Sequence, residues 1–192
     1  MGVIISSFLF QPPTPPTPLK SNTYFWLKTS LGTNIPAFYI KQPQARFSLI
    51  FSHGNAEDLG GLHEYLLTLS KLFYVNILSY DYSGYGLGLA DTENIKNSIS
   101  PSEENCYADI EAACDYLTKI EDVAYDRIIL YGRSLGSGPT CYLAEKATKQ
   151  NKPFAGVILH CPFLSICRVV LDMGYQFPTD YFPNASRIEN VG

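Results

Sequence analysis

A single serine stands between two glycines at the point where an apolar run ends. Residues 132–136 read Gly-Arg-Ser-Leu-Gly, and the apolar residues Ile128–Leu130 come shortly before them. This Gly-x-Ser-x-Gly pattern is typical of a nucleophile elbow, in which a strand turns sharply into a helix and exposes a serine hydroxyl. A Cβ would clash in so tight a turn, so Gly132 and Gly136 are expected to pack closely. The chemistry indicated is acyl transfer through Ser134 as the catalytic nucleophile.

The pattern alone is a weak signal. Gly-x-Ser-x-Gly arises by chance in about 7% of chains of this length, because glycine and serine are common residues. The alternative is a glycine-rich strand-to-helix turn that carries a bystander serine. The residues upstream favour the elbow.

A second apolar run, Phe47–Ser52, is followed by His53-Gly54-Asn55. Acyl transfer needs two backbone N–H donors that hold the oxyanion. One is supplied by the residue after the nucleophile, here Leu135, and the other by the loop after the strand that precedes the first helix. Gly54 permits a close approach of that loop, so Asn55 is the expected second donor; the alternative is an ordinary loop. Four further residues are expected to line this site: His53, Gly54, Arg133 and His160.

The chain resembles the alpha/beta-hydrolase domain-containing protein 17 group, also called family 108, of the alpha/beta-hydrolase superfamily. The matching segments occur in the family's order and are Phe51–Gly60, Ser79–Gly86, Tyr107–Ile110, Ile129–Ser134, Leu159–Pro162 and Phe182–Asn184. The resemblance implies an alpha/beta-hydrolase fold with strand order 1-2-4-3-5-6. It also implies a serine hydrolase that removes fatty acyl groups from protein cysteines at membranes.

The sequence does not identify the general base that must accept the proton of Ser134. In the alpha/beta-hydrolase fold an Asp or Glu and then a His follow the nucleophile along the chain. The resemblance implies that both come after Gly192, so that the chain is an incomplete core with little activity of its own. His53 and His160 end the strands on either side of Ser134, but a structural role is favoured for both. The third histidine, His63, is expected on a helix surface. Asp172 and Asp180 follow the sixth strand and are a disfavoured alternative for the acid member of the triad.

Composition excludes several other classes of protein. The 192 residues carry a formal net charge of −4, which argues against general nucleic-acid binding. The five cysteines form no CxxC pair, so free thiols in a reducing, cytoplasmic compartment are expected rather than a disulfide or metal framework. Nothing in the sequence indicates a cofactor or a metal.

Residues 1–20 differ from residues 21–192, which are expected to form the hydrolase core. Met1–Phe10 is apolar but too short to cross a bilayer, and Met1–Ser6 fits the pattern for myristoylation of Gly2. Two interpretations stay open: a lipid that brings the protein to a membrane, and an apolar leader packed on the domain. Residues 11–18 are proline-rich and are read as a stiff spacer.

The elements that must position these residues follow from hydrophobic periodicity. Residues 23–28 and 35–40 alternate about a turn and predict a hairpin. From residue 46 onward, predicted strands at 46–52, 75–80, 127–131 and 156–159 alternate with predicted helices at 57–73, 102–117 and 135–148. This alternation predicts an α/β fold with a mostly parallel sheet and helices on both faces. In the loop after residue 80, Asp81 is expected to accept backbone donors, and Ser83 is not a second elbow.

The sequence is therefore compatible with three alternative functions. The first is a serine hydrolase for acyl esters or thioesters, with an S-acylated protein or a small acyl ester as its partner at a membrane. The second is a non-catalytic module that binds acyl groups. The third is a serine peptidase of the same fold.

Overall fold

The computed structural model describes residues 9–90, 99–165 and 180–191. The predictions that fall on Gly2 and Asp172 therefore lie outside the described residues. The strands are β1 (Phe25–Lys28), β2 (Asn34–Ile40), β3 (Ser48–Ser52), β4 (Asn76–Tyr80), β5 (Ile128–Arg133) and β6 (Gly156–His160). The α-helices are α2 (Leu59–Phe73), α3 (Leu87–Ala90), α4 (Glu103–Asp115), α5 (Ser137–Lys149) and α7 (Asn184–Ile188). The short helical turns are η2 (Tyr116–Ile120), η3 (Tyr125–Arg127) and η4 (Ser134–Gly136).

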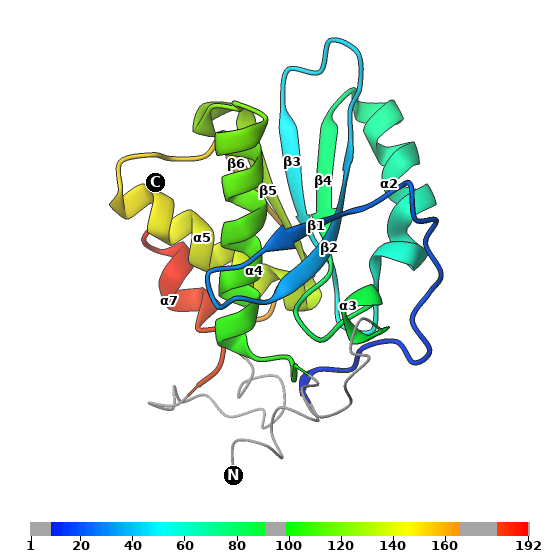
Figure 1. Ribbon diagram of the computed structural model, residues 1–192. Helices are drawn as coiled ribbons and strands as arrows, with labels where there is room; N and C mark the ends of the chain where they lie inside the picture. The colour runs from blue at the N-terminus through cyan, green and yellow to red at the C-terminus, as the bar shows by residue number, and fades with distance from the viewer. Residues whose placement is uncertain (1–8, 91–98, 166–179, 192) are drawn as a thin grey trace.

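The strands form one six-stranded sheet in the order β1-β2-β4-β3-β5-β6. β1 and β2 form the predicted antiparallel hairpin, whereas β4, β3, β5 and β6 run parallel. Helix α2 covers one face of the sheet, and α4 and α5 cover the other (Figure 1). The expected α/β layering and strand order are confirmed.

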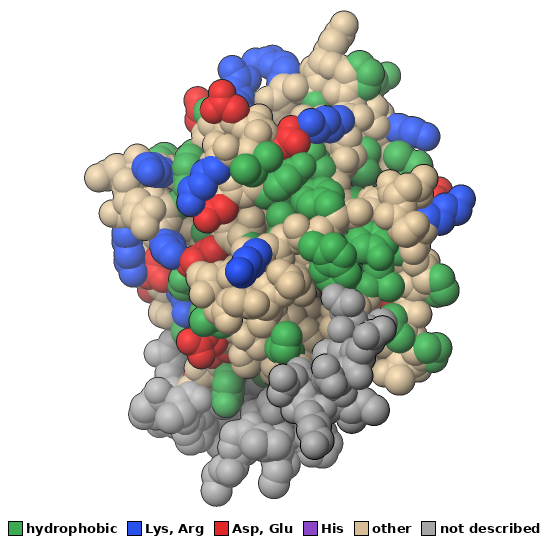
Figure 2. Space-filling view, viewed as in Figure 1, with side chains coloured by type: hydrophobic (Ala, Val, Ile, Leu, Met, Phe, Trp, Pro, Cys, Tyr) green, Lys and Arg blue, Asp and Glu red, His purple; other side chains and the backbone are tan. Residues whose placement is uncertain are grey.

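Two apolar clusters hold these layers together because successive strand residues point to opposite faces. On β3, Ile50 packs in the cluster that includes residues of α4 and α5, while its neighbours Leu49 and Phe51 pack in the cluster that includes α2. On the outer surface, Figure 2 shows hydrophobic side chains gathered around β1 and β2, and mixed acidic and basic side chains over α4 and α5. None of the helices in the described ranges is long and apolar enough to span a membrane.

Element boundaries differ from the sequence prediction where side chains cap a helix or strands pair. Helix α2 begins at Leu59 rather than residue 57 because the Asp58 side chain accepts the Gly61 N–H. Ser102 caps α4 in the same way, as the sequence predicts. Strand β5 runs two residues beyond the predicted end because Gly132 pairs with Ser52 of β3. Both differences concern the ends of elements and leave their order unchanged.

Candidate active site

Ser134 lies at the turn between β5 and α5, is exposed, and has a φ of +47°. A positive φ is strained for a residue with a side chain, and such strain is common at active-site residues. A Cβ on Gly132 would lie 2.5 Å from the Gly136 carbonyl oxygen, and one on Gly136 would lie 2.1 Å from the Ser52 carbonyl oxygen. Both glycines are thus required by close packing, and the backbone has the geometry of a nucleophile elbow.

Side chains from the end of the described chain hold this turn. The Ser137 hydroxyl donates to the Ser134 carbonyl oxygen at 2.7 Å, and Asn184 Nδ2 donates to Ser137 Oγ at 3.0 Å. Phe182 packs so tightly on α5 that a Cβ on Gly138 would lie 2.2 Å from its ring. Sequence reasoning did not assign this network to the site, although Phe182–Asn184 belongs to the segments that resemble the family.

The loop between β3 and α2, residues 53–58, lies beside the elbow. The Glu57 carboxylate joins the two, since it accepts the Gly54 N–H at 2.7 Å and the Arg133 guanidinium at 2.6 Å. The structure therefore brings the loop that carries Asn55 next to the turn that carries Leu135. Their role as oxyanion donors stays a prediction. Arg133 and Gly54 are placed at this junction, and the link through Glu57 is one that the sequence did not reveal.

The Asn55 side chain hydrogen-bonds to three residues outside the loop. Its Oδ1 accepts the Tyr85 hydroxyl at 2.7 Å and the Gln11 N–H at 2.9 Å. Its Nδ2 donates to the Leu9 carbonyl oxygen at 2.8 Å. Burial raises the pKa of Tyr85, so the phenol stays protonated and able to donate. The orientation of Asn55 is therefore tied to residues of the N-terminal segment.

His53, the first residue of this loop, is fully buried rather than open to the site. Its ring centroid lies 4.3 Å from that of Tyr82, and its Nε2 lies 3.5 Å from Asp81 Oδ1. Burial raises the pKa of Asp81, and this carboxylate accepts the Leu59 N–H at the start of α2. His53 thus occupies a structural position, and Asp81 accepts a backbone donor as the sequence predicts.

A second buried carboxyl lies nearby. Asp109 on α4 accepts both the N–H and the hydroxyl of Ser83, at 2.8 and 2.7 Å. Burial raises the pKa of Asp109 from its ordinary 3.8 to about 7. The hydroxyl of Ser83 is committed to this carboxyl, which agrees with the expectation that Ser83 is not a second nucleophile.

The other two histidines hydrogen-bond to groups other than the serine hydroxyl, although His160 pairs with Arg133 in the strand register. His160 is exposed at the end of β6, with Nδ1 2.9 Å from the Tyr131 hydroxyl, and His63 lies on α2 beside Glu64. Within residues 9–90, 99–165 and 180–191, no hydrogen bond joins Ser134 Oγ to another side chain. In the described part of the chain Ser134 Oγ thus has no side-chain hydrogen-bond partner, and its role as the nucleophile stays a prediction.

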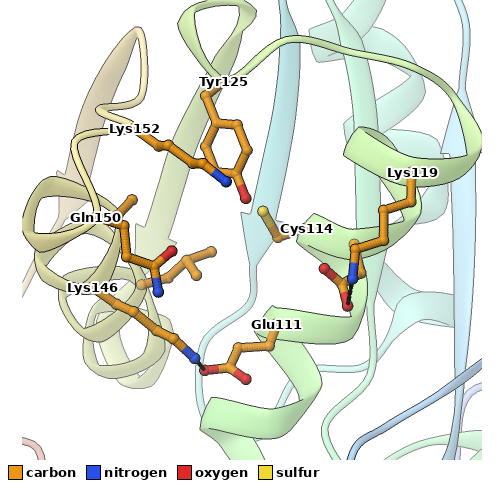
Figure 3. Close-up of a pocket in the computed structure, with 10 residues that line it drawn as sticks. Glu111, Cys114, Lys119, Tyr125, Lys146, Gln150 and Lys152 are labelled. Atoms are coloured by element: carbon orange, nitrogen blue, oxygen red, sulfur yellow. Dashed lines mark hydrogen bonds and ion pairs between the residues drawn. The ribbon is translucent and has the colours of Figure 1, made fainter.

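Two cavities lie away from this site. One, of about 320 Å³, opens between α4 and α5 (Figure 3), and four of its five charged side chains pair with one another, while Lys152 lies over the Tyr125 ring. Lys146 bonds Glu111, and Lys119 Nζ lies 2.9 Å from Asp115 Oδ2. The other, of about 480 Å³, is apolar and is lined by Leu49, Leu69, Phe73, Val75, Ile129, Tyr131 and Ile158. Ser134 lines neither of these two cavities. A third cavity, of about 220 Å³, adjoins the loop between β3 and α2 and is lined by Pro13, Thr17, Ala56, Glu57, Asp58, Gly61 and Leu62. The elbow and the adjoining loop define the candidate site.

Comparison with known proteins identifies the group to which this arrangement belongs. The chain is 37% identical over 169 residues to alpha/beta hydrolase domain-containing protein 17B of Homo sapiens, covering 87% of this chain and 54% of that protein. It is 38% identical over 169 residues to protein 17C of Mus musculus, covering 87% of this chain and 48% of that protein. The chain belongs to the alpha/beta hydrolase domain-containing protein 17 family. It spans about half the length of the curated relatives it matches. No family model matches the chain.

Solved structures give the same fold for this family member. An alpha-beta hydrolase from Vibrio vulnificus superposes with a TM-score of 0.69 at 17% identity, covering 88% of this chain and 59% of that one. A thermostable carboxyl esterase from Bacillus coagulans superposes with a TM-score of 0.57 at 16% identity, covering 71% and 43%. At such low identity the likeness shows the alpha/beta-hydrolase fold alone. The family and the fold are those of hydrolases.

Proposed function

We propose that this chain carries the nucleophile and the oxyanion-binding groups of a serine hydrolase that acts on acyl esters or thioesters. The observation that carries the proposal is Ser134, which is exposed, has a φ of +47° and lies between β5 and α5. The loop with Asn55 adjoins it through the Glu57–Arg133 pair. The substrate class proposed is S-acylated protein, so that the reaction is protein depalmitoylation.

The chemistry at this site follows from the positions of the groups. Ser134 Oγ forms a bond to the acyl carbonyl carbon and gives its proton to a general base. The backbone N–H groups of Leu135 and Asn55 stabilise the oxyanion that develops. The sulfur of the substrate cysteine leaves with a proton from the same base, and water then hydrolyses the acyl-serine. None of the described residues is proposed as the base, since no described side chain hydrogen-bonds to Ser134 Oγ.

The test is covalent labelling followed by turnover. An active-site-directed fluorophosphonate is expected to modify Ser134, and Ser134→Ala is expected to abolish both labelling and hydrolysis. Ser30→Ala is the matched control, since Ser30 is an exposed serine remote in sequence from the elbow. Labelling that persists in Ser134→Ala contradicts the assignment. A palmitoyl thioester, a short-chain ester and a peptide amide, assayed side by side, separate thioesterase, esterase and peptidase.

One observation favours a second candidate, an acyl-binding module without catalysis. No described side chain hydrogen-bonds to Ser134 Oγ, so the serine has no activating partner in that part of the chain. Such a module binds a palmitoyl thioester and leaves it intact. Binding without Ser134-dependent turnover selects this candidate over the hydrolase.

We also propose a cytoplasmic protein in peripheral contact with a membrane, through a lipid on Gly2. The described cysteines Cys106, Cys114, Cys141 and Cys161 are free, which supports a reducing compartment. The net charge of −4 supports the absence of nucleic-acid partners. The partners proposed are therefore S-acylated proteins at a membrane surface.

A further inference from the structure

The N-terminal segment is attached to both ends of the loop that carries Asn55. Residues 9 and 11 bond the Asn55 side chain, and the Thr17 N–H donates to Asp58 Oδ2 at 2.7 Å. Between these two points the segment has neither helix nor strand and bends at residues 14 and 15 (Figure 1). A Cβ on Gly60 would lie 2.3 Å from the Thr17 carbonyl oxygen, so the contact at this end is close.

Phe10 anchors the segment in the core. Its side chain is only 5% exposed, and its ring meets that of Phe182 at 6.4 Å in an edge-to-face arrangement. Phe182 also packs against α5 at Gly138, in the helix that follows the elbow. The N-terminal segment therefore contacts residues that support both halves of the candidate site.

The contacts to Asn55 involve backbone groups of the segment. The Leu9 carbonyl oxygen accepts from Asn55 Nδ2, and the Gln11 N–H donates to Asn55 Oδ1, so the two backbone groups bond both polar atoms of the side-chain amide. Tyr85 donates the third hydrogen bond. Substituting the side chains of residues 9 and 11 leaves these backbone hydrogen bonds in place, whereas removing the N–H of residue 11 breaks one of them.

We propose that residues 9–11 are a positioning element of the catalytic site, which sets the orientation of the Asn55 backbone amide through the Asn55 side chain. The inference rests on the proposed function, in which that amide binds the oxyanion. Asn55 is the residue that touches the reacting atoms, and residues 9–11 act through it. Any process that withdraws the N-terminal segment from the domain lowers turnover, whereas substrate binding is retained.

The size of the effect follows from the sensitivity of oxyanion stabilisation to geometry. Losing one oxyanion donor costs about 100- to 1,000-fold in kcat, and a displacement of about 1 Å costs on the order of 100-fold. Losing one of the three hydrogen bonds to Asn55 loosens the donor without removing it. The expected decrease in kcat is therefore on the order of 10- to 100-fold, with KM within about twofold of its original value.

The experiment compares Gln11→Pro with Gln11→Ala in the full chain. Gln11 is exposed and is followed by two prolines, and proline at this position removes the N–H that donates to Asn55 Oδ1 at 2.9 Å and to the Tyr85 hydroxyl at 3.2 Å. Alanine retains that N–H and is the matched control. kcat and KM are measured on a palmitoyl thioester, together with the affinity for a trifluoromethyl ketone that mimics the tetrahedral intermediate. Far-UV circular dichroism and thermal unfolding confirm that each variant folds.

We expect Gln11→Pro to lower kcat and the ketone affinity in parallel, while Gln11→Ala matches the wild type. Asn55→Ala is expected to have an effect of similar size, and the double variant Gln11→Pro/Asn55→Ala to be no worse than Asn55→Ala. Additive losses, or a Gln11→Pro variant as active as Gln11→Ala, overturn the positioning role while the proposed function stands. A wild type without Ser134-dependent turnover overturns the proposed function and the positioning role with it.

Discussion

Asp109 makes the stability of this fold depend on pH in a direction opposite to that of most carboxylates. The side chain is fully buried and accepts two hydrogen bonds from Ser83, yet burial raises the pKa of this carboxyl from 3.8 to about 7. The folded protein therefore binds the proton more tightly than the unfolded chain. This difference in proton binding stabilises the folded protein fully below about pH 4, and the stabilisation is lost as the pH rises toward 7.

The size of this change in stability follows from the difference between the pKa of Asp109 in the folded protein and its ordinary value. Each pH unit between them is about 1.4 kcal/mol, so the free energy of unfolding falls by about 4 kcal/mol across this range. Asp81, whose pKa is also raised by burial, acts in the same direction. Asp109→Asn replaces the carboxyl with a neutral group of the same shape. Its oxygen still accepts the Ser83 N–H, and its amide donates to the Ser83 hydroxyl.

The assay is urea unfolding at pH 4, 5, 6, 7 and 8, followed by the fluorescence of the single tryptophan, Trp26. We expect the free energy of unfolding of Asp109→Asn, relative to the wild type, to rise by about 4 kcal/mol between pH 4 and pH 7 and then to level off. Asp126→Asn is the control, because Asp126 lies at the surface in η3. Equal pH dependence in the wild type and Asp109→Asn would refute the reasoning.

Three further predictions concern the elbow and the N-terminus. Gly136→Ala is expected to cost about 3 kcal/mol of stability in urea unfolding, since its Cβ would lie 2.1 Å from the Ser52 carbonyl oxygen; an unchanged midpoint contradicts the close packing. Asn184→Ala is expected to lower the free energy of unfolding by about 1 to 3 kcal/mol, because it removes a buried donor to Ser137. The rate of fluorophosphonate labelling is expected to fall as well. An unaffected labelling rate would show that this hydrogen-bond network does not support the site. Gly2→Ala is expected to move the protein from the membrane fraction to the supernatant on fractionation, because it removes the proposed myristoyl chain, and stable membrane binding needs that lipid together with a second signal. An unmodified N-terminus by mass spectrometry excludes the lipid.

Local patterns were sufficient for most of the architecture. The alternation of strands and helices comes from hydrophobic periodicity, which reflects which side chains face the core. The Gly-x-Ser-x-Gly segment places the turn at Ser134, because only glycine fits where the flanking backbones meet. Ser102 marked the start of α4 because its side chain bonds a donor three residues away in the same helix turn. Each of these features depends on neighbours along the chain, so the sequence contains the whole interaction.

The supports of the candidate site depend instead on contacts between distant residues. The Glu57–Arg133 pair joins residues 76 apart, the Asn184–Ser137 bond joins residues 47 apart, and the Asn55–Gln11 bond joins residues 44 apart. Any exposed polar residue is able to make such bonds, so residue type alone does not select the partner. The tertiary structure selects it, because packing of Phe10 and Phe182 and the pairing of β3 with β5 bring these particular groups within hydrogen-bond distance.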